Sequence, residues 1–161
     1  MRIYSGMIAV RAATESDIAE IVRVVNAAFQ VERDFRAGDR TSVEEVARLM
    51  ANSVFLVAKR DDAIAGAVQV KVSGNTGYFG MLAVDPAQQR YGIGRTLLEA
   101  AENYCRGQGC HEITLHTGSI RTELFPYYGK FGYVITKIEP APSEGSPFTK
   151  QFDIVYMAKP L

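Results

Sequence analysis

The sequence predicts an α+β fold with a mixed, mostly antiparallel sheet flanked by helices. Two observations lead to this prediction. Stretches rich in β-branched and aromatic residues alternate with stretches whose apolar residues recur every three or four positions, and their order along the chain is βααβββαβαββ. We find no internal repeat and no linker between domains. Residues 1–161 are therefore expected to form a single domain, which is long enough to bury a core without metals or disulfides.

The chain is expected to begin with a strand at residues 7–11, after a leader or late-ordered tail at residues 1–6. Two helices follow, because Thr14-x-x-Asp17 and Ser42-x-x-Glu45 resemble capping boxes. Each box precedes apolar residues at helical spacing, namely Ile18, Ile21, Val22, Val25 and Phe29 in the first helix and Val43, Val46, Leu49 and Met50 in the second. The charge-dense residues 32–40 between the helices are expected to form a surface turn.

An antiparallel meander is expected next, with strands at residues 54–59, 64–72 and 78–84. Residues 60–62 and 74–77 separate these strands and have the composition of turns.

The second half begins with a helix that ends near Gly107 or Gly109, and a strand at residues 112–117 follows it. This order of strand, helix and strand implies a parallel, right-handed crossover. The remaining elements are a helix at residues 124–131 and two strands at 133–139 and 151–159, joined by the Pro- and Gly-rich residues 140–147. If the last strand is an exposed edge, it could pair between subunits, so a homodimer is plausible.

The charge balance excludes some classes of partner. Lys plus Arg and Asp plus Glu are equal at 18 each, so no basic excess points to nucleic acid. No apolar run approaches the length of a membrane span, and the N-terminus lacks the pattern of a secretory signal. We therefore expect a cytoplasmic protein with no nucleic-acid or membrane partner.

Two cysteines and two histidines lie close together in the sequence. Cys105 and Cys110 lack Cys-x-x-Cys spacing, so we expect reduced thiols. His111 and His116 are an odd number of residues apart on what reads as one strand, which would place them on opposite faces. No metal site is expected.

Gly92-Ile-Gly94 lies between an apolar strand and an amphipathic helix. The first N–H groups of a helix have no intrahelical acceptor and carry a positive partial charge, so this point can bind a phosphate, and glycine allows close approach to the backbone. Two nucleotide sites fit less well. Leu97 replaces the third glycine of a dinucleotide fingerprint, and no Gly-Lys-Ser/Thr follows.

Residues 89–94, Gln-Arg-Tyr-Gly-Ile-Gly, match the Gln/Arg-x-x-Gly-x-Gly/Ala signature, and the chain resembles the GCN5-related N-acetyltransferase (GNAT) family here and over nearly its full length. The resemblance implies an acetyltransferase fold that uses acetyl-CoA as cosubstrate. It implies that the strand residues Leu82, Ala83 and Val84 bind the pantetheine arm through their backbone. It also implies a clamp on the pyrophosphate formed by Gln89, Arg90, Tyr91, Gly92, Ile93, Gly94 and Arg95.

A second segment, Leu124 to Tyr133, is similar to the Phe-Tyr-x-Lys-x-Gly-Phe segment of the family. Tyr128 takes the position of the family tyrosine, so the resemblance implies that its hydroxyl protonates the leaving thiolate of the coenzyme. A packed aromatic residue is the alternative. The chain departs from the family at Arg121, where many members carry asparagine. Arg121 is expected to be a solvated surface residue, with a coenzyme phosphate or an acceptor carboxylate as alternative partners.

The implied reaction is direct transfer of the acetyl group to a primary amine of a small molecule or peptide. The amine needs a base, for which His116 and Glu32 are candidates. Tyr78, which begins the third strand of the meander, is a further candidate for contact with the acceptor or a water molecule, with core packing as the alternative. Phe35 is another, since residues 30–40 and 140–148 are expected to shape the acceptor pocket. Two alternatives stay open: a non-catalytic acyl-CoA-binding sensor or interaction module, and a nucleotide-binding domain.

Overall fold

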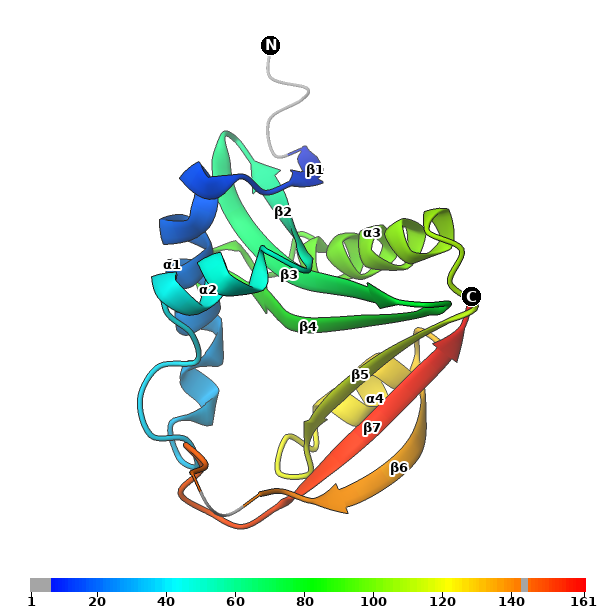
Figure 1. The fold of residues 1–161 in the computed structure, drawn as a ribbon. Helices are drawn as coiled ribbons and strands as arrows, with labels where there is room; N and C mark the ends of the chain where they lie inside the picture. The colour runs from blue at the N-terminus through cyan, green and yellow to red at the C-terminus, as the bar shows by residue number, and fades with distance from the viewer. Residues whose placement is uncertain (1–6, 143–144) are drawn as a thin grey trace.

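The computed structural model describes residues 7–142 and 145–161. Within these residues seven strands form one sheet in the order β1-β2-β3-β4-β5-β7-β6. The strands are β1 (Ile8–Ala12), β2 (Val54–Arg60), β3 (Ala63–Ser73), β4 (Thr76–Val84), β5 (Glu112–Gly118), β6 (Val134–Pro140) and β7 (Asp153–Pro160). Neighbours are antiparallel except β4 and β5, which are parallel. This arrangement, shown in Figure 1, confirms the predicted fold class.

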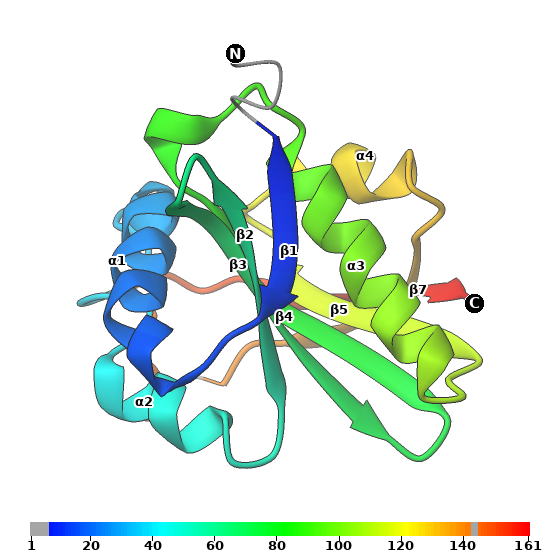
Figure 2. The ribbon, with the colours of Figure 1, turned by 90° about the horizontal axis from the view of Figure 1, so that it is seen from above.

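Helices cover both faces of the sheet. The helices are α1 (Ile18–Ala28), α2 (Val43–Leu49), α3 (Ile93–Gly107) and α4 (Leu124–Gly129), with short 3-10 segments at Glu15–Asp17, Phe29–Glu32 and Pro86–Gln88. Figure 2 shows α1 and α2 on one side of the sheet and α3 on the other. None of the described helices is long and apolar enough to cross a membrane.

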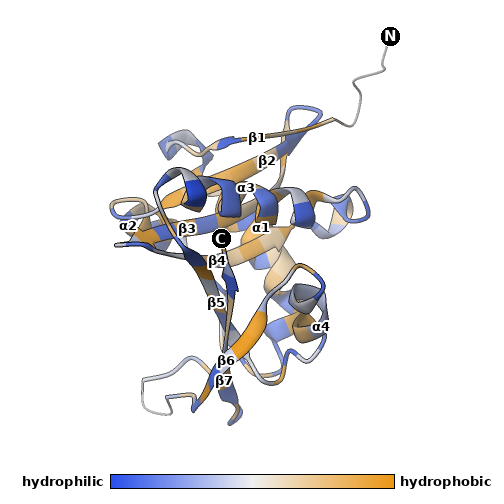
Figure 3. Cartoon of the chain, turned by 90° about the vertical axis from the view of Figure 1, so that its right-hand side faces the viewer, coloured by the Kyte–Doolittle hydropathy of each residue, from blue (hydrophilic) through white to orange (hydrophobic). Residues whose placement is uncertain are grey.

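Two groups of buried side chains form the core, one on each face. Ile21, Val25 and Val46 pack on one face with the inward side chains of β2, β3 and β4. Leu97 and Leu98 of α3 pack on the other. The strand β2 is apolar through most of its length, as its colour in Figure 3 shows. The helical spacing in the sequence identified the buried faces in part: Ile18, Ile21, Val25 and Val46 are buried, whereas Val43 is exposed and the buried Val24 was missed.

The last strand, whose position in the sheet the sequence leaves open, is not an edge strand. β7 lies between β5 and β6 and pairs with both, so β6 is the edge strand at that end of the sheet. A strand that returns between two earlier strands cannot be recognised from its own residues. The edge argument for a homodimer therefore does not apply to β7, and the homodimer itself stays a prediction. The expectation for residues 1–6 lies outside the described residues.

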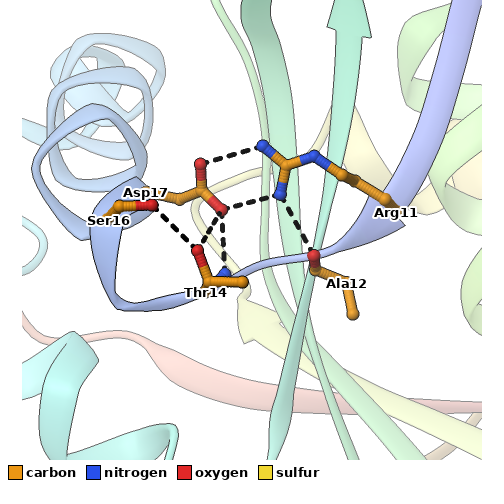
Figure 4. A network of polar contacts seen from close by, with 5 residues as sticks. All are labelled: Arg11, Ala12, Thr14, Ser16 and Asp17. Atoms are coloured by element: carbon orange, nitrogen blue, oxygen red, sulfur yellow. Dashed lines mark hydrogen bonds and ion pairs between the residues drawn. The ribbon is translucent and has the colours of Figure 1, made fainter.

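Asp17 joins the start of the first helix to β1 (Figure 4). Its carboxylate accepts two hydrogen bonds from the Arg11 guanidinium, at 2.7 and 3.0 Å, and one from the Thr14 backbone N–H at 2.8 Å. This is the predicted capping box. The hydrogen bonds from Arg11 and Thr14 hold the pKa of Asp17 below its usual range.

Asp17→Ala is expected to lower the free energy of unfolding at neutral pH by about 1 kcal/mol, because the Thr14 backbone N–H and the Arg11 guanidinium lose their acceptor. Since the native pKa is depressed, the carboxylate stabilises the fold above about pH 4, and this contribution is lost as the pH falls through the native pKa. Denaturant unfolding at pH 7 and pH 3 measures this: the free energies of unfolding of the variant and the wild type should differ less at pH 3 than at pH 7. Glu15→Ala, an exposed carboxylate in the same turn, is the control; an equal loss there would contradict the assignment.

Candidate functional site

Strands β4 and β5 pair only at one end. Residues 76–78 of β4 pair with residues 112–114 of β5, and beyond them the strands diverge, as Figure 1 shows. β4 also contains a bulge, where its register against β3 shifts and Met81 has a φ of 51°. From residue 79 to residue 84, β4 therefore has no strand partner on its β5 side within the described part of the chain. Its amide groups on that side are available to a ligand.

A groove lies beside this free edge, at the start of α3. The helix follows Gly92, which has a φ of 73°, and Thr96 donates its backbone N–H to the Gly92 carbonyl at 3.0 Å. The N–H groups of residues 93–95 precede this first bond, so they have no intrahelical acceptor. The groove has a volume of about 690 Å³ and is bordered on its far side by Tyr127 and Lys130. Its position at a helix N-terminus suits an anion.

Most of the residues predicted to bind the coenzyme lie along this groove. Its walls include Val84, Gln89, Arg90, Gly92, Ile93, Gly94 and Arg95. Tyr91 does not line it, because its ring is half exposed and lies 3.5 Å from the guanidinium carbon of Arg60. Ala83 is buried in the core on the α1 side, and Leu82 borders a second pocket. These two residues can therefore contact a ligand in the groove only through their backbone.

Two glycines allow the close packing around the groove. A Cβ atom on Gly94 would lie 2.9 Å from the Tyr127 hydroxyl. A Cβ atom on Gly66 of β3 would lie 2.8 Å from the Ala83 carbonyl oxygen and 2.9 Å from side-chain carbons of α3. Gly66 thus lets the start of α3 sit directly on the sheet. The sequence pointed to Gly94 through its motif, whereas an isolated glycine in a strand carried no such signal.

A second cavity, which we call the cleft pocket, opens where β4 and β5 diverge. Its volume is about 360 Å³. Residues 78–82 of β4 and 115–118 of β5 form its floor, and the chain between residues 28 and 40 covers one side. Phe148 and Phe152 complete the wall. The structure thus brings together Glu32, Phe35, Tyr78 and His116, the four residues predicted to contact the acceptor.

Tyr128 of α4 borders the cleft pocket, whereas its neighbour Tyr127 borders the groove. The Tyr128 ring packs edge-on against Phe79 and Tyr133, with centroids 5.7 and 6.0 Å apart. Burial raises the pKa of Tyr128 well above its usual value, so the hydroxyl is protonated at neutral pH. No hydrogen bond from this hydroxyl to any described residue is present.

The segment at residues 32–40 contains the predicted turn, but it is not wholly a surface segment, because Glu32 and Phe35 are buried. Phe35 is 4% exposed and packs against Phe148 and Phe152, and the Ala37 backbone N–H donates to the Pro147 carbonyl at 2.7 Å. An aromatic contact between distant parts of the chain therefore overrides the local polarity. The segment becomes a wall of the cleft pocket.

Arg121 is likewise not a solvated arginine. It donates to Glu32 at 2.7 Å and to Glu123 at 2.9 Å, and its side chain is only 14% exposed. Glu32, which is 6% exposed, also accepts from Arg36 at 3.0 Å. The two arginines hold the Glu32 carboxylate between the α1 end and the loop before α4. Sequence reasoning missed Arg36 and Arg40, because a charge-dense segment gives no sign of which side chains turn inward.

His116 and Tyr78 face each other across the floor of the cleft pocket. Their rings stack at 5.4 Å, and the Tyr78 hydroxyl lies 3.4 Å from His116 Nε2. Although the imidazole keeps contact with solvent, partial burial and, secondarily, the charge of Arg40 lower the pKa of His116. Burial raises the pKa of Tyr78. Both groups are therefore uncharged at neutral pH.

The cysteine and histidine cluster does not form a ligand set. His111 precedes β5 rather than belonging to it, and Cys105 and Cys110 are buried free thiols. Burial raises the pKa of Cys105 to about 12. Across residues 7–142 and 145–161, no group of three or more His, Cys, Asp or Glu side chains could hold a metal ion.

The chain is similar in sequence to a curated acetyltransferase and in fold to solved structures. Mycothiol acetyltransferase of Cellulomonas flavigena is 28% identical over 118 residues, which span 62% of this chain and 34% of that relative. The chain therefore spans about a third of that relative's length. Ard1 from Thermoplasma volcanium superposes with a TM-score of 0.79 at 20% identity, over 96% of this chain and 97% of that one.

A second solved structure, yncA from Salmonella typhimurium with its cofactor acetyl-CoA, has a TM-score of 0.72 at 19% identity and covers 96% of this chain and 94% of its own. Residues 18–133 match the family model described as the acetyltransferase (GNAT) family, whose members use acetyl-CoA. This match spans most of the chain, from the start of α1 to the residue before β6. The protein therefore belongs to the GNAT acetyltransferase family.

Proposed function

We propose that the protein is an acetyl-CoA-dependent N-acetyltransferase that moves the acetyl group directly from the thioester to a primary amine of a small molecule or peptide. One observation carries this proposal: the groove and the cleft pocket adjoin along the same two elements. On β4, Val84 borders the groove and Leu82 the cleft pocket; on α4, Tyr127 borders the groove and Tyr128 the cleft pocket. A ligand with phosphates in the groove can therefore extend along β4 toward Tyr128.

The free N–H groups of residues 93–95 and the loop at residues 89–92 bind the pyrophosphate in this proposal. Arg90 supports this role, because it has a φ of 79°, a conformation that non-glycine residues rarely adopt and that is enriched at ligand-binding sites. The unpaired β4 edge then binds the pantetheine arm. Its N–H groups near residues 82–84 steady the oxyanion that forms when the amine attacks the thioester carbonyl.

The amine must be neutral to attack. An amine with a pKa near 10.4 is only about 0.04% free base at pH 7, which corresponds to about 4.6 kcal/mol. A C–N bond forms, the C–S bond breaks, and the amine proton passes to a base. The thiolate that leaves is protonated by Tyr128, which stays in its neutral form because burial raises its pKa.

We assign the base to His116, acting directly or through a water molecule. Its lowered pKa keeps the imidazole neutral and able to accept a proton at pH 7. Glu32 is a poorer candidate, because both of its carboxylate oxygens are engaged by arginines. The Tyr78 hydroxyl lies 3.4 Å from His116 Nε2, where it orients the imidazole.

His116→Gln is expected to lower kcat/KM by about 10²-fold or more, the usual effect of losing a base. In the wild type, kcat/KM should rise with pH through a pKa below 6.5, because His116 must lose its proton to act, and this limb should be absent in the variant. The pH profiles of both proteins with one acceptor test this. His111→Gln, an exposed histidine before β5, is the control. An unchanged limb in His116→Gln would remove His116 from the mechanism.

Release of free coenzyme thiol in the presence of candidate amines tests the proposed reaction. Acetylated amine and free thiol should appear in equal amounts. The alternative, a non-catalytic acyl-CoA-binding module, predicts coenzyme binding without thiol release for every amine tried. A cytoplasmic location and the absence of nucleic-acid and membrane partners stay predictions from the sequence.

A further inference from the structure

The walls of the cleft pocket carry more positive than negative charge. Among the described residues that line it, the cations are Arg36, Arg40 and Arg121, and the single carboxylate is Glu32. Glu32 is shared between Arg36 and Arg121, at 3.0 and 2.7 Å. Glu32 therefore serves two guanidinium groups, and Arg121 also pairs with Glu123 at 2.9 Å, outside the pocket lining. The side chains that line the pocket keep a net positive charge.

Among the described residues that line the pocket, Arg40 is the guanidinium that pairs with no carboxylate. Within residues 7–142 and 145–161, no hydrogen bond or ion pair joins its side chain to another residue, and its guanidinium carbon lies 5.3 Å from the centre of the Phe29 ring. Burial and the neighbouring charge of Arg36 lower the pKa of Arg40, and the charges of Glu32 and Glu45, neither of which forms an ion pair with it, oppose this only in part. The charge of Arg40 is thus less well stabilised than it would be in water. An arginine stays charged in proteins, so an anionic ligand would stabilise that charge.

The rest of the pocket limits the size and character of the ligand. Phe35, Phe148 and Phe152 form an aromatic wall, with ring centroids 4.6 to 6.5 Å apart. Arg40 also acts on the floor of the pocket: its charge adds to burial in lowering the pKa of His116, and it opposes the rise in the pKa of Tyr78 that burial causes. The volume of about 360 Å³ suits a small molecule.

We propose that the acetyl acceptor is a small amine that carries a carboxylate, an amino-acid-like compound whose carboxylate is bound by Arg40. A guanidinium binds a carboxylate through two parallel hydrogen bonds, which orients as well as attracts it. The amine of such a compound lies toward His116 and Tyr128, and its apolar part packs on the aromatic wall. Polycationic amines are repelled by the same charges. The acetyl-transfer step of this proposal rests on the proposed function, whereas the recognition of the carboxylate does not.

The test compares acids with their neutral amides. N-acetyl derivatives of alanine, leucine and phenylalanine, each as the free carboxylate and as the carboxamide, are titrated calorimetrically into the protein with and without coenzyme A. These probes contain no ionising amine, so only the carboxylate differs within a pair. At least one acid is expected to bind about tenfold or more tightly than its amide. Arg40→Gln should abolish this preference, and Arg40→Lys should restore part of it.

Arg33→Gln is the matched control, because Arg33 is an exposed arginine of the same segment and does not line the pocket. It should keep the full preference for the acid. Equal affinity for acid and amide in the wild type, binding of neither, or a preference that survives Arg40→Gln would each overturn the proposal.

The same proteins separate this proposal from the proposed function. If acetyl-CoA binds and phenylalanine and phenethylamine are acetylated equally well, carboxylate recognition is wrong and the acetyltransferase assignment stands. If acetyl-CoA does not bind but the acid is preferred through Arg40, the acetyltransferase assignment is wrong and carboxylate recognition stands.

Discussion

Tyr128→Phe is expected to lower the rate of acetyl transfer by about 10²-fold or more while acetyl-CoA binds almost normally. The substitution removes one hydroxyl and keeps the ring that packs against Phe79 and Tyr133, so the fold should be intact. The hydroxyl bonds to no described residue and borders the cleft pocket, which leaves it available to the leaving thiolate. Steady-state kinetics and calorimetric titration with acetyl-CoA measure the two effects separately.

Tyr127→Phe is the control for this experiment, because it removes a hydroxyl from the adjacent residue of α4. Tyr127 borders the groove rather than the cleft pocket, so kcat should change by no more than a few-fold. Undiminished transfer in Tyr128→Phe would exclude the hydroxyl as the proton donor. Weak coenzyme binding in that variant would assign Tyr128 a binding role instead.

Gly92→Asp is expected to weaken binding of acetyl-CoA at least 100-fold, because it places a negative charge beside the N–H groups that bind the pyrophosphate. Gly92 lies immediately before α3, and a Cβ atom there meets no atom within 4 Å. The new side chain therefore fits without a clash, and its cost to folding comes mainly from the positive φ. Calorimetric titration of the variant measures the loss.

Gly109→Asp is the matched control. Gly109 also has a positive φ, of 84°, and open space around its Cβ position, but it lies beyond the opposite end of α3. It should reproduce the backbone strain and the added charge while coenzyme binding stays normal. If Gly92→Asp binds acetyl-CoA as well as the wild type does, the groove is not the phosphate site.

Much of the fold was predictable because apolar residues recur every three or four positions in a helix and every second position in a strand. The capping box at Thr14 and Asp17 and the motif at residues 89–94 both depend on neighbouring residues, so the sequence displays them directly. The position of β7 between β5 and β6 was not predictable, since it depends on where the chain returns. The same holds for the close approach of α3 to Gly66.

The cleft pocket was predicted only in part, for a related physical reason. The sequence identified His116 and Tyr78 as single residues with suitable chemistry. Their contact was not predictable, because the two residues are 38 positions apart and lie on different strands. Glu32 and Arg121 form an ion pair across 89 residues, and both were expected to be solvated because most charged residues are. Local composition indicates only that a charged residue is usually exposed. Here the packing of Phe35 against Phe148 and Phe152 places the neighbouring charged side chains inside the pocket.

The central claim is that the groove at the start of α3 binds the coenzyme, and calorimetric titration of the purified protein tests it most directly. Acetyl-CoA and coenzyme A are titrated first, and ATP and NAD are then tried as competitors. The account predicts micromolar affinity for acetyl-CoA and coenzyme A, with neither nucleotide competing. Absence of binding by acetyl-CoA and coenzyme A would contradict it, and the glycine turn would then be a structural feature of the helix start.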